Sequence, residues 1–123
     1  MKKKNKKILF LLIIVLVGIL FFSFKGGKIE NGKYDSFAKC LTDSGAKMYG
    51  AAGCVYCKEQ KKMFGDSWKY VNYIECADGE FQTAECENAG ITGYPTWEFT
   101  DDTRMPGIVL LQQLSSITDC PLN

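Results

Sequence analysis

The most extended apolar pattern in the chain lies at its N-terminal end. Residues 8–24, ILFLLIIVLVGILFFSF, carry no charge, and five lysines lie within residues 1–7. A helix of that length reaches about 25 Å, close to the apolar thickness of a bilayer. Lysines before such a run stay on the cytoplasmic side, so the rest of the chain should lie outside. The pattern predicts a basic cytoplasmic tail (1–7) and a single-pass transmembrane anchor in the cell membrane (8–24).

A cleaved signal peptide is the alternative interpretation of this run. The run is longer than the usual apolar core of such a peptide, and no A-x-A-like cleavage site comes after it. Both alternatives export the remainder of the chain. Residues 25–33 contain three glycines and are typical of a short flexible linker, which leaves 34–123 as the folded domain.

Helical and strand periods alternate along the folded part. Phe37, Cys40 and Leu41 share one helical face, whereas the run WKYVNYIEC alternates as strands do. The order predicts an α/β domain, a small mixed sheet flanked by helices on both faces. The predicted elements are a helix (34–45), a strand (46–52), a helix (58–65), a strand (68–76), a short helix (81–90), a hairpin (95–110) with Pro106 at its edge, and a helix (110–118).

The net charge of the folded part argues against one class of binding partner. The chain has a net charge of +1, but residues 25–123 hold 10 basic and 14 acidic side chains, a net charge of −4. A mildly acidic domain argues against nucleic acid as a partner.

Six cysteines and no histidine then set the candidate chemistry. In an exported domain an even number of cysteines indicates disulfides first, and six cysteines allow 15 pairings. A structural zinc site needs four ligands, often two close cysteine pairs or histidines. Only Cys54 and Cys57 form a close pair here, so we expect no metal and no other cofactor.

The stretch GCVYC places that pair between a predicted strand and a predicted helix. The N–H groups and dipole at a helix start stabilise a thiolate, which is the attacking species in disulfide exchange. We therefore expect Cys54 to be the nucleophile. Cys57, one turn later, is expected to be partly buried and to resolve the mixed disulfide.

Three segments resemble one known family. They are AKMYGAAGCVYCKEQKKMFG (46–65), VNYIECADGEFQTAEC (71–86) and AGITGYPTWEF (89–99), and they resemble the thioredoxin-like domain of bacterial vitamin K epoxide reductase homologues and its free-standing relatives. The resemblance covers about 36–122. It implies a thioredoxin-like fold on the oxidising side of a membrane, where the domain passes electrons from thiols of client proteins to an integral, quinone-linked partner.

The resemblance also implies roles for individual residues. Cys54 and Cys57 would be the exchanging pair, and Pro95 would follow a cis peptide bond, leaving the backbone of Tyr94 to pair with an extended substrate. It further implies a structural bridge between Cys76 and Cys86.

Cys40 and Cys120 remain, and the sequence leaves open whether they pair, stay as buried thiols or link two chains. Against pairing, the first and last helices of such folds tend to cover opposite faces of the sheet.

The segment around the cysteine pair departs from the family pattern. Relatives usually carry an aromatic pair before the first cysteine and Pro-His between the two, whereas this chain has Ala52-Gly53 and Val55-Tyr56. A histidine can stabilise the thiolate in its charged form, and tyrosine cannot at neutral pH. We therefore expect a weaker oxidant, in the lower half of the range of roughly −270 to −120 mV.

The sequence thus predicts a membrane-tethered, extracytoplasmic thiol–disulfide oxidoreductase. A redox-silent binding module that kept the fold is the alternative. Reversible oxidation of Cys54 and Cys57 distinguishes the two.

Overall fold

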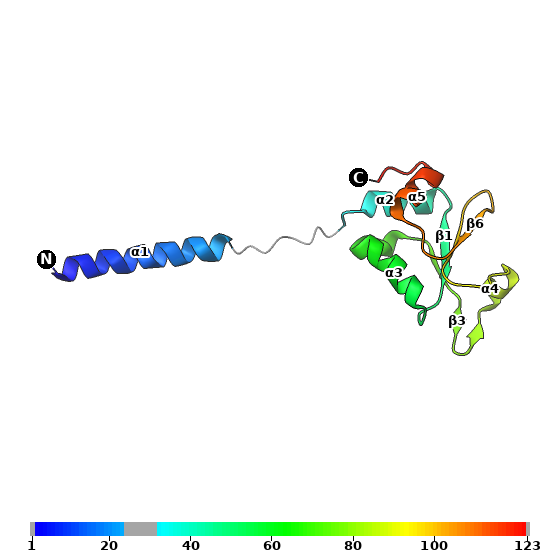
Figure 1. Ribbon diagram of the computed structural model, residues 1–123, viewed down its shortest axis with the longest axis horizontal. Coiled ribbons are helices and arrows are strands. Elements are labelled where there is room, and N and C mark those ends of the chain that lie inside the picture. Colours follow the sequence, from blue (N-terminus) through cyan, green and yellow to red (C-terminus); the bar gives the residue numbers. More distant parts are fainter. Residues whose placement is uncertain (1, 24–31, 123) are drawn as a thin grey trace. The chain divides into compact units, whose positions relative to one another are not determined.

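The computed structural model describes residues 2–23 and 32–122. The chain divides into two compact units, Met1–Glu30 and Asn31–Asn123. The first contains one helix, α1 (Lys2–Ser23), and large apolar side chains between Ile8 and Ile19 are exposed on it. Both units are drawn in Figure 1.

The predicted anchor and linker both extend past the described residues. Phe24, the last residue of the anchor, and residues 25–31 of the linker lie outside them. None of the helices in the described ranges combines the length and hydropathy that crossing a membrane requires. The anchor stays a prediction from the sequence.

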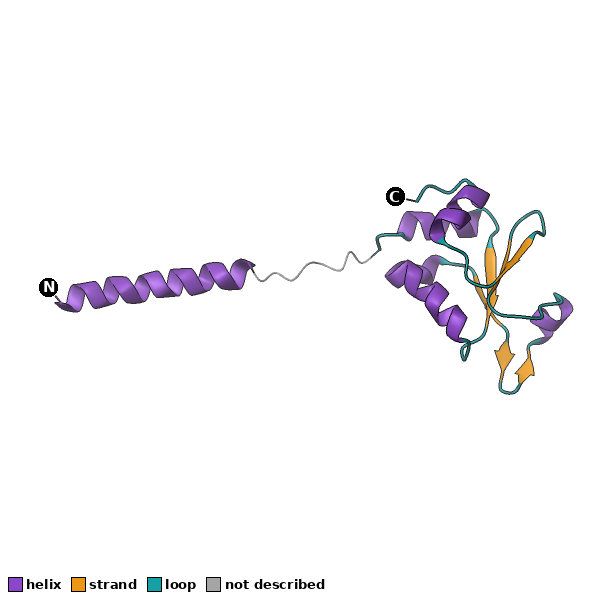
Figure 2. Cartoon of the chain, viewed as in Figure 1, coloured by secondary structure: helices purple, strands orange, loops and turns teal. Residues whose placement is uncertain are grey.

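The second unit is a small α/β domain around a four-stranded mixed sheet (Figure 2). The strand order is β2-β1-β5-β6, with β1 parallel to β2 and antiparallel to β5, and with β5 antiparallel to β6. Pro106 ends β6 at the open edge, where a missing N–H costs no sheet hydrogen bond. The strands are β1 (Lys47–Gly50), β2 (Tyr73–Glu75), β5 (Thr96–Glu98) and β6 (Arg104–Pro106).

Alternation along β1 divides the interior into two clusters. Met48 and Tyr49 are both buried, and successive strand residues point to opposite faces. Met48 belongs to the larger cluster, with Trp97 of β5, and Tyr49 belongs to the smaller one, with Ile91. Each face of the sheet therefore has its own apolar core.

Helices cover both faces, which confirms the predicted α/β architecture. Helices α2 (Asp35–Asp43), α3 (Val55–Phe64) and α5 (Leu111–Thr118) contribute buried side chains to the cluster of Met48. Helix α4 (Ala84–Asn88) contributes Cys86 to the cluster of Tyr49.

The predicted strand at 68–76 is wrong in its first half. A 3₁₀ helix, η1 (Gly65–Tyr70), occupies that stretch and leaves only Tyr73–Glu75 for β2. The ring of Trp68 packs edge-on against the rings of Phe64 and Tyr73, with 5.5 Å and 5.7 Å between the ring centres. These aromatic contacts stabilise a helical turn that the apolar pattern alone does not reveal.

The predicted helix at 81–90 is also too long. Phe81–Gln82 forms strand β4, which pairs with β3 (Ala77–Asp78) in a small hairpin of its own. Helix α4 begins only after Thr83, whose hydroxyl accepts a hydrogen bond from the Cys86 N–H, as helix-capping residues do.

The first and last helices of this domain lie on the same face. Helices α2 and α5 are neighbours (Figure 1), so the expectation that they cover opposite faces is wrong. Asp119 adopts a left-handed conformation that ends α5 and turns the chain back. Cys120 is thereby brought to Cys40, and the structure joins the two in a disulfide.

Candidate functional site

The cysteine pair lies where β1 passes into α3. Cys54 has extended backbone angles and is the N-cap of α3. Its sulfur accepts a hydrogen bond from the Cys57 N–H, with 3.1 Å between nitrogen and sulfur. N–H groups at a helix start are unpaired within the helix and favour a negative charge beside them. The half-buried Cys54 sulfur therefore lies at the end of α3 from which the unpaired N–H groups point.

Cys57 lies one turn later and has different surroundings. Its side chain is fully buried, whereas the sequence predicted only partial burial for the second cysteine. Burial, with a smaller contribution from the hydrogen bond to Cys54, raises the pKa of the Cys57 thiol to about 12. At neutral pH it is therefore protonated.

The segment before β5 borders the exposed side of Cys54. The Cys54 thiol lies 3.6 Å from the carbonyl oxygen of Tyr94, which accepts its hydrogen bond. The bond between Tyr94 and Pro95 is cis, and Pro95 is fully buried. The structure thus brings together the four residues that the sequence singled out for exchange and substrate contact.

Two residues behind the pair were missed by the sequence analysis. The Tyr73 hydroxyl donates a 2.8 Å hydrogen bond to Glu75 Oε2, and Glu75 Oε1 accepts from the N–H groups of Ala52 and Ala77. Burial alone would raise the pKa of the Glu75 carboxyl, but these hydrogen bonds outweigh it and lower that pKa. Glu75 thus remains ionised and fixes the loop before Cys54 through Ala52.

Gly50 explains how Tyr73 and Cys57 come close. A Cβ atom at Gly50 would lie 2.8 Å from Tyr73 Cε2 and 3.1 Å from Cys57 Sγ, too close for any side chain without a shift. The strand pairing places Gly50 opposite Glu75 in the parallel β1–β2 register. Tyr73 and Glu75 share one face because they are two residues apart, which a sequence pattern can show. Their neighbours across the sheet depend on the register between the strands, which a sequence pattern cannot show.

A lysine on α3 completes these surroundings. The Lys61 ammonium lies 3.9 Å from the centre of the Tyr73 ring, a cation–π contact. Its positive charge lowers the pKa of Cys57 and so opposes part of the effect of burial.

The other four cysteines are oxidised. Cys76 is joined to Cys86 and Cys40 to Cys120, so Cys54 and Cys57 are the free thiols of the described domain. Within the described residues no three metal-binding side chains form a cluster. The chemistry available to the site is that of a dithiol, which two electrons can interconvert with a disulfide.

Comparison with known proteins connects the chain to the same chemistry. No protein-family model matches the chain. The chain is 38% identical over 94 residues to the thiol-disulfide oxidoreductase LTO1 of Arabidopsis thaliana, an alignment that covers 72% of this chain and 25% of that protein. An alignment that covers 72% of the chain includes its central residues wherever the alignment begins, and Cys54 and Cys57 are among these residues. The chain is therefore related in sequence to a thiol–disulfide oxidoreductase of which it spans about a quarter.

Proposed function

We propose that the Asn31–Asn123 unit is a thioredoxin-like thiol–disulfide oxidoreductase. The observation that carries this proposal is the position of Cys54, half-buried at the start of α3, with its sulfur 3.1 Å from the Cys57 nitrogen. Both thiols are free whereas the other four cysteines are paired. The relation to a thiol-disulfide oxidoreductase supports the same activity.

The proposed exchange has two steps. The Cys54 thiolate attacks one sulfur of a client disulfide, which forms a mixed disulfide and releases the other client sulfur as a thiolate that takes up a proton. The Cys57 thiol then loses its proton, and its sulfur attacks Cys54. This step forms the Cys54–Cys57 disulfide and releases the second client thiol. The client gains two electrons and the protein loses two; client oxidation is the reverse.

The buried position of Cys57 makes the second step depend on deprotonation. Because the pKa of Cys57 is raised to about 12, only a small thiolate fraction exists at neutral pH. The mixed disulfide should therefore persist longer than one resolved by an ordinary thiol. Lys61 increases that thiolate fraction, since its charge favours the ionised sulfur.

We further propose that this domain is a relative of the thioredoxin-like domains of vitamin K epoxide reductase homologues, held outside the cytosol by an N-terminal membrane anchor. The uncharged run at 8–24, the lysines before it and two disulfides in the domain support this placement. Protease added to intact cells should then digest the domain, whereas a domain protected until lysis would contradict the placement.

An integral, quinone-linked oxidase is the proposed electron acceptor. Reduced full-length chain mixed with membranes of its host should be reoxidised at Cys54 and Cys57 only while quinone is present. Equal reoxidation after quinone extraction would exclude such a partner.

Trapping of the mixed disulfide tests the activity itself. The Cys57→Ser variant keeps the attacking sulfur but cannot resolve, so a peptide disulfide should convert it to a stable adduct that mass spectrometry assigns to Cys54. The matched Cys54→Ser variant should give no adduct at neutral pH, because Cys57 is buried and protonated. If Cys57→Ser also forms no adduct, the redox-silent binding module replaces this proposal.

A further inference from the structure

A concave site bordered by Tyr94 lies between the β3–β4 hairpin and the segment before β5. Its volume is about 600 Å³, and it is open to solvent. We call it the hairpin pocket, and its lining includes Gly79 to Gln82 of the hairpin together with Ile91, Thr92 and Tyr94. This volume lies within the usual range of ligand pockets, roughly 300–1,000 Å³.

Tyr94 makes the hairpin pocket continuous with the redox site. Its carbonyl oxygen contacts the Cys54 sulfur at 3.6 Å, while the residue also lines the pocket. Its hydroxyl accepts a 2.8 Å hydrogen bond from the Gln82 side chain on β4. Tyr94 therefore contacts the Cys54 sulfur and also forms part of the pocket wall.

The walls of the pocket are held in place by the fold. The Cys76–Cys86 disulfide joins the base of the hairpin to α4. Gln82 also donates to the carbonyl of Ile91 at 2.8 Å, which ties β4 to the opposite wall. The pocket is therefore formed before anything binds, which lowers the entropy lost on binding.

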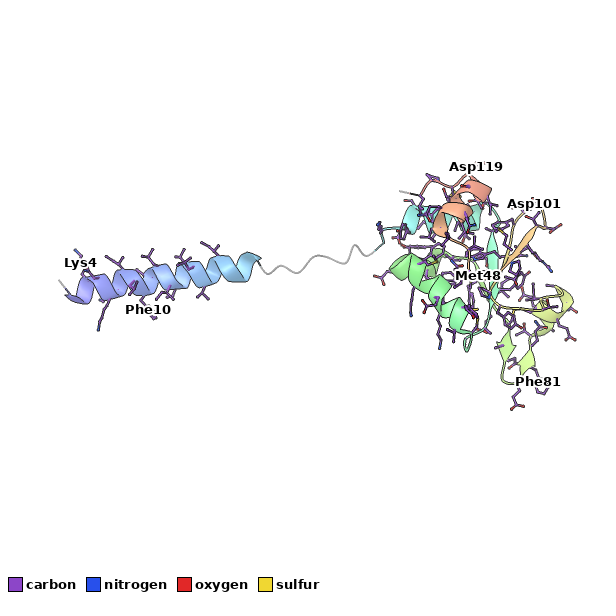
Figure 3. All side chains as sticks on the ribbon, in the orientation of Figure 1. Lys4, Phe10, Met48, Phe81, Asp101 and Asp119 are labelled. Atoms are coloured by element: carbon purple, nitrogen blue, oxygen red, sulfur yellow. A yellow bond between two sulfur atoms is a disulfide. The ribbon has the colours of Figure 1, made fainter. Side chains whose placement is uncertain are left out.

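The surface around the pocket combines an exposed aromatic ring with negative charge. Phe81 is 79% exposed and projects at the outer end of the hairpin (Figure 3). No lysine or arginine occurs between Lys69 and Arg104, a stretch with eight acidic residues. Four exposed acidic side chains belong to the hairpin or to α4, namely Asp78, Glu80, Glu85 and Glu87.

We propose that the hairpin pocket binds an extended, positively charged segment of a protein substrate, next to the cysteine that bonds to Cys54. The inference rests on the proposed function, which supplies a polypeptide at Cys54. Such a segment advances about 3.3 Å per residue, so two or three residues carry it from the sulfur past Tyr94 and into the pocket. Lysine or arginine side chains there pair with Glu80 in the pocket lining, and their aliphatic stems cover Phe81.

Peptide binding to the full chain in a neutral detergent tests the inference without any disulfide chemistry. Two cysteine-free peptides of equal length and apolar content are compared, one with alternate lysines and one with alternate glutamates. The lysine peptide should bind with a Kd at least about fivefold lower, equivalent to about 1 kcal/mol. The preference should shrink as salt is added, because the Glu80 side chain is exposed.

Two variants of the pocket and one matched control locate the binding. Glu80→Lys should remove the preference, and Phe81→Ala should raise the Kd of the lysine peptide. Asp43→Lys makes the same change of charge at an exposed residue on α2 and should leave the preference intact. For peptides that carry a disulfide, Glu80→Lys should raise KM with kcat unchanged, while turnover of glutathione disulfide stays the same.

The outcomes separate this inference from the proposed function. Equal Kd values for the two peptides, or a preference that survives Glu80→Lys, would overturn the hairpin pocket as a site for cationic segments. That result would leave the chemistry of Cys54 untouched. Conversely, lysine-peptide binding that depends on Glu80 would stand even if Cys54 formed no mixed disulfide.

Discussion

Cys54 and Cys57 differ only in their surroundings, and one turn of helix creates the difference. Cys54 is half-buried and receives a hydrogen bond from a helical N–H, whereas Cys57 faces the apolar core. Burial disfavours an ionised sulfur at Cys57, whose pKa is raised to about 12. The division into attacking and resolving thiol thus follows from where the helix begins.

Alkylation of the reduced protein should reveal this difference. At pH 7 to 8 iodoacetamide should modify Cys54 and leave Cys57 almost untouched. Because the pKa of Cys57 is raised to about 12, its thiolate fraction, and with it the alkylation rate, should increase about tenfold per pH unit over the alkaline range below that value. Mass spectrometry of peptides from timed samples measures both rates. Equal rates at pH 8 would contradict the assigned roles.

At the scale of elements, the two disulfides act on different parts of the domain. The bridge between Cys40 and Cys120 spans 80 residues and ties α2 to the tail after α5. The bridge between Cys76 and Cys86 spans 10 residues and holds the hairpin to α4. The longer loop restricts the unfolded chain more, so the first bridge should contribute more to stability.

Urea unfolding of two double variants tests that order. Cys40→Ala/Cys120→Ala should lower the free energy of unfolding by about 4 kcal/mol, and Cys76→Ala/Cys86→Ala by about 2–3 kcal/mol, in the chain-entropy treatment. The first variant should keep Cys54 reactive because its bridge joins α2 to the tail after α5 and includes no residue of α3. A larger decrease in the free energy of unfolding on removal of the Cys76–Cys86 bridge would contradict the predicted order.

Elements whose signal is local were predictable from the sequence, and those shaped by contacts between segments were not. The strand–cysteine–helix order around Cys54 follows from neighbouring residues. The 3₁₀ helix η1 depends on the packing of Trp68 against Phe64 and Tyr73. Strand β4 depends on pairing with β3, whereas the sequence pattern favoured a helix from Phe81 onward.

The residues of the candidate site likewise include some that the sequence predicted and some that it did not. Cys54, Cys57, Tyr94 and Pro95 were found from motif and resemblance. Glu75 was missed because its relation to Ala52 arises only when β1 and β2 pair in parallel register. The sequence contained a usable signal, since Tyr73 and Glu75 share a strand face, but it could not show which neighbour they meet.

At the scale of the whole molecule, charge is distributed unevenly around the cysteine pair. Helix α3 carries Lys58, Lys61 and Lys62 and one acidic residue, Glu59, which is ion-paired with Lys62, whereas all charged residues from the hairpin to β5 are acidic. A client approaching Cys54 therefore meets a positive border on one side and a negative one on the other. Such an arrangement orients a polypeptide more than it strengthens binding.

A redox titration of the full chain is the most direct test of the central claim. Samples equilibrated over a series of glutathione ratios are quenched, alkylated and analysed by mass spectrometry. One two-electron transition is expected, confined to Cys54 and Cys57, with a midpoint between roughly −270 and −195 mV. The bridges Cys40–Cys120 and Cys76–Cys86 should stay oxidised throughout. The absence of any transition at Cys54 and Cys57, or a Cys54 that resists alkylation after mild reduction, would contradict the account.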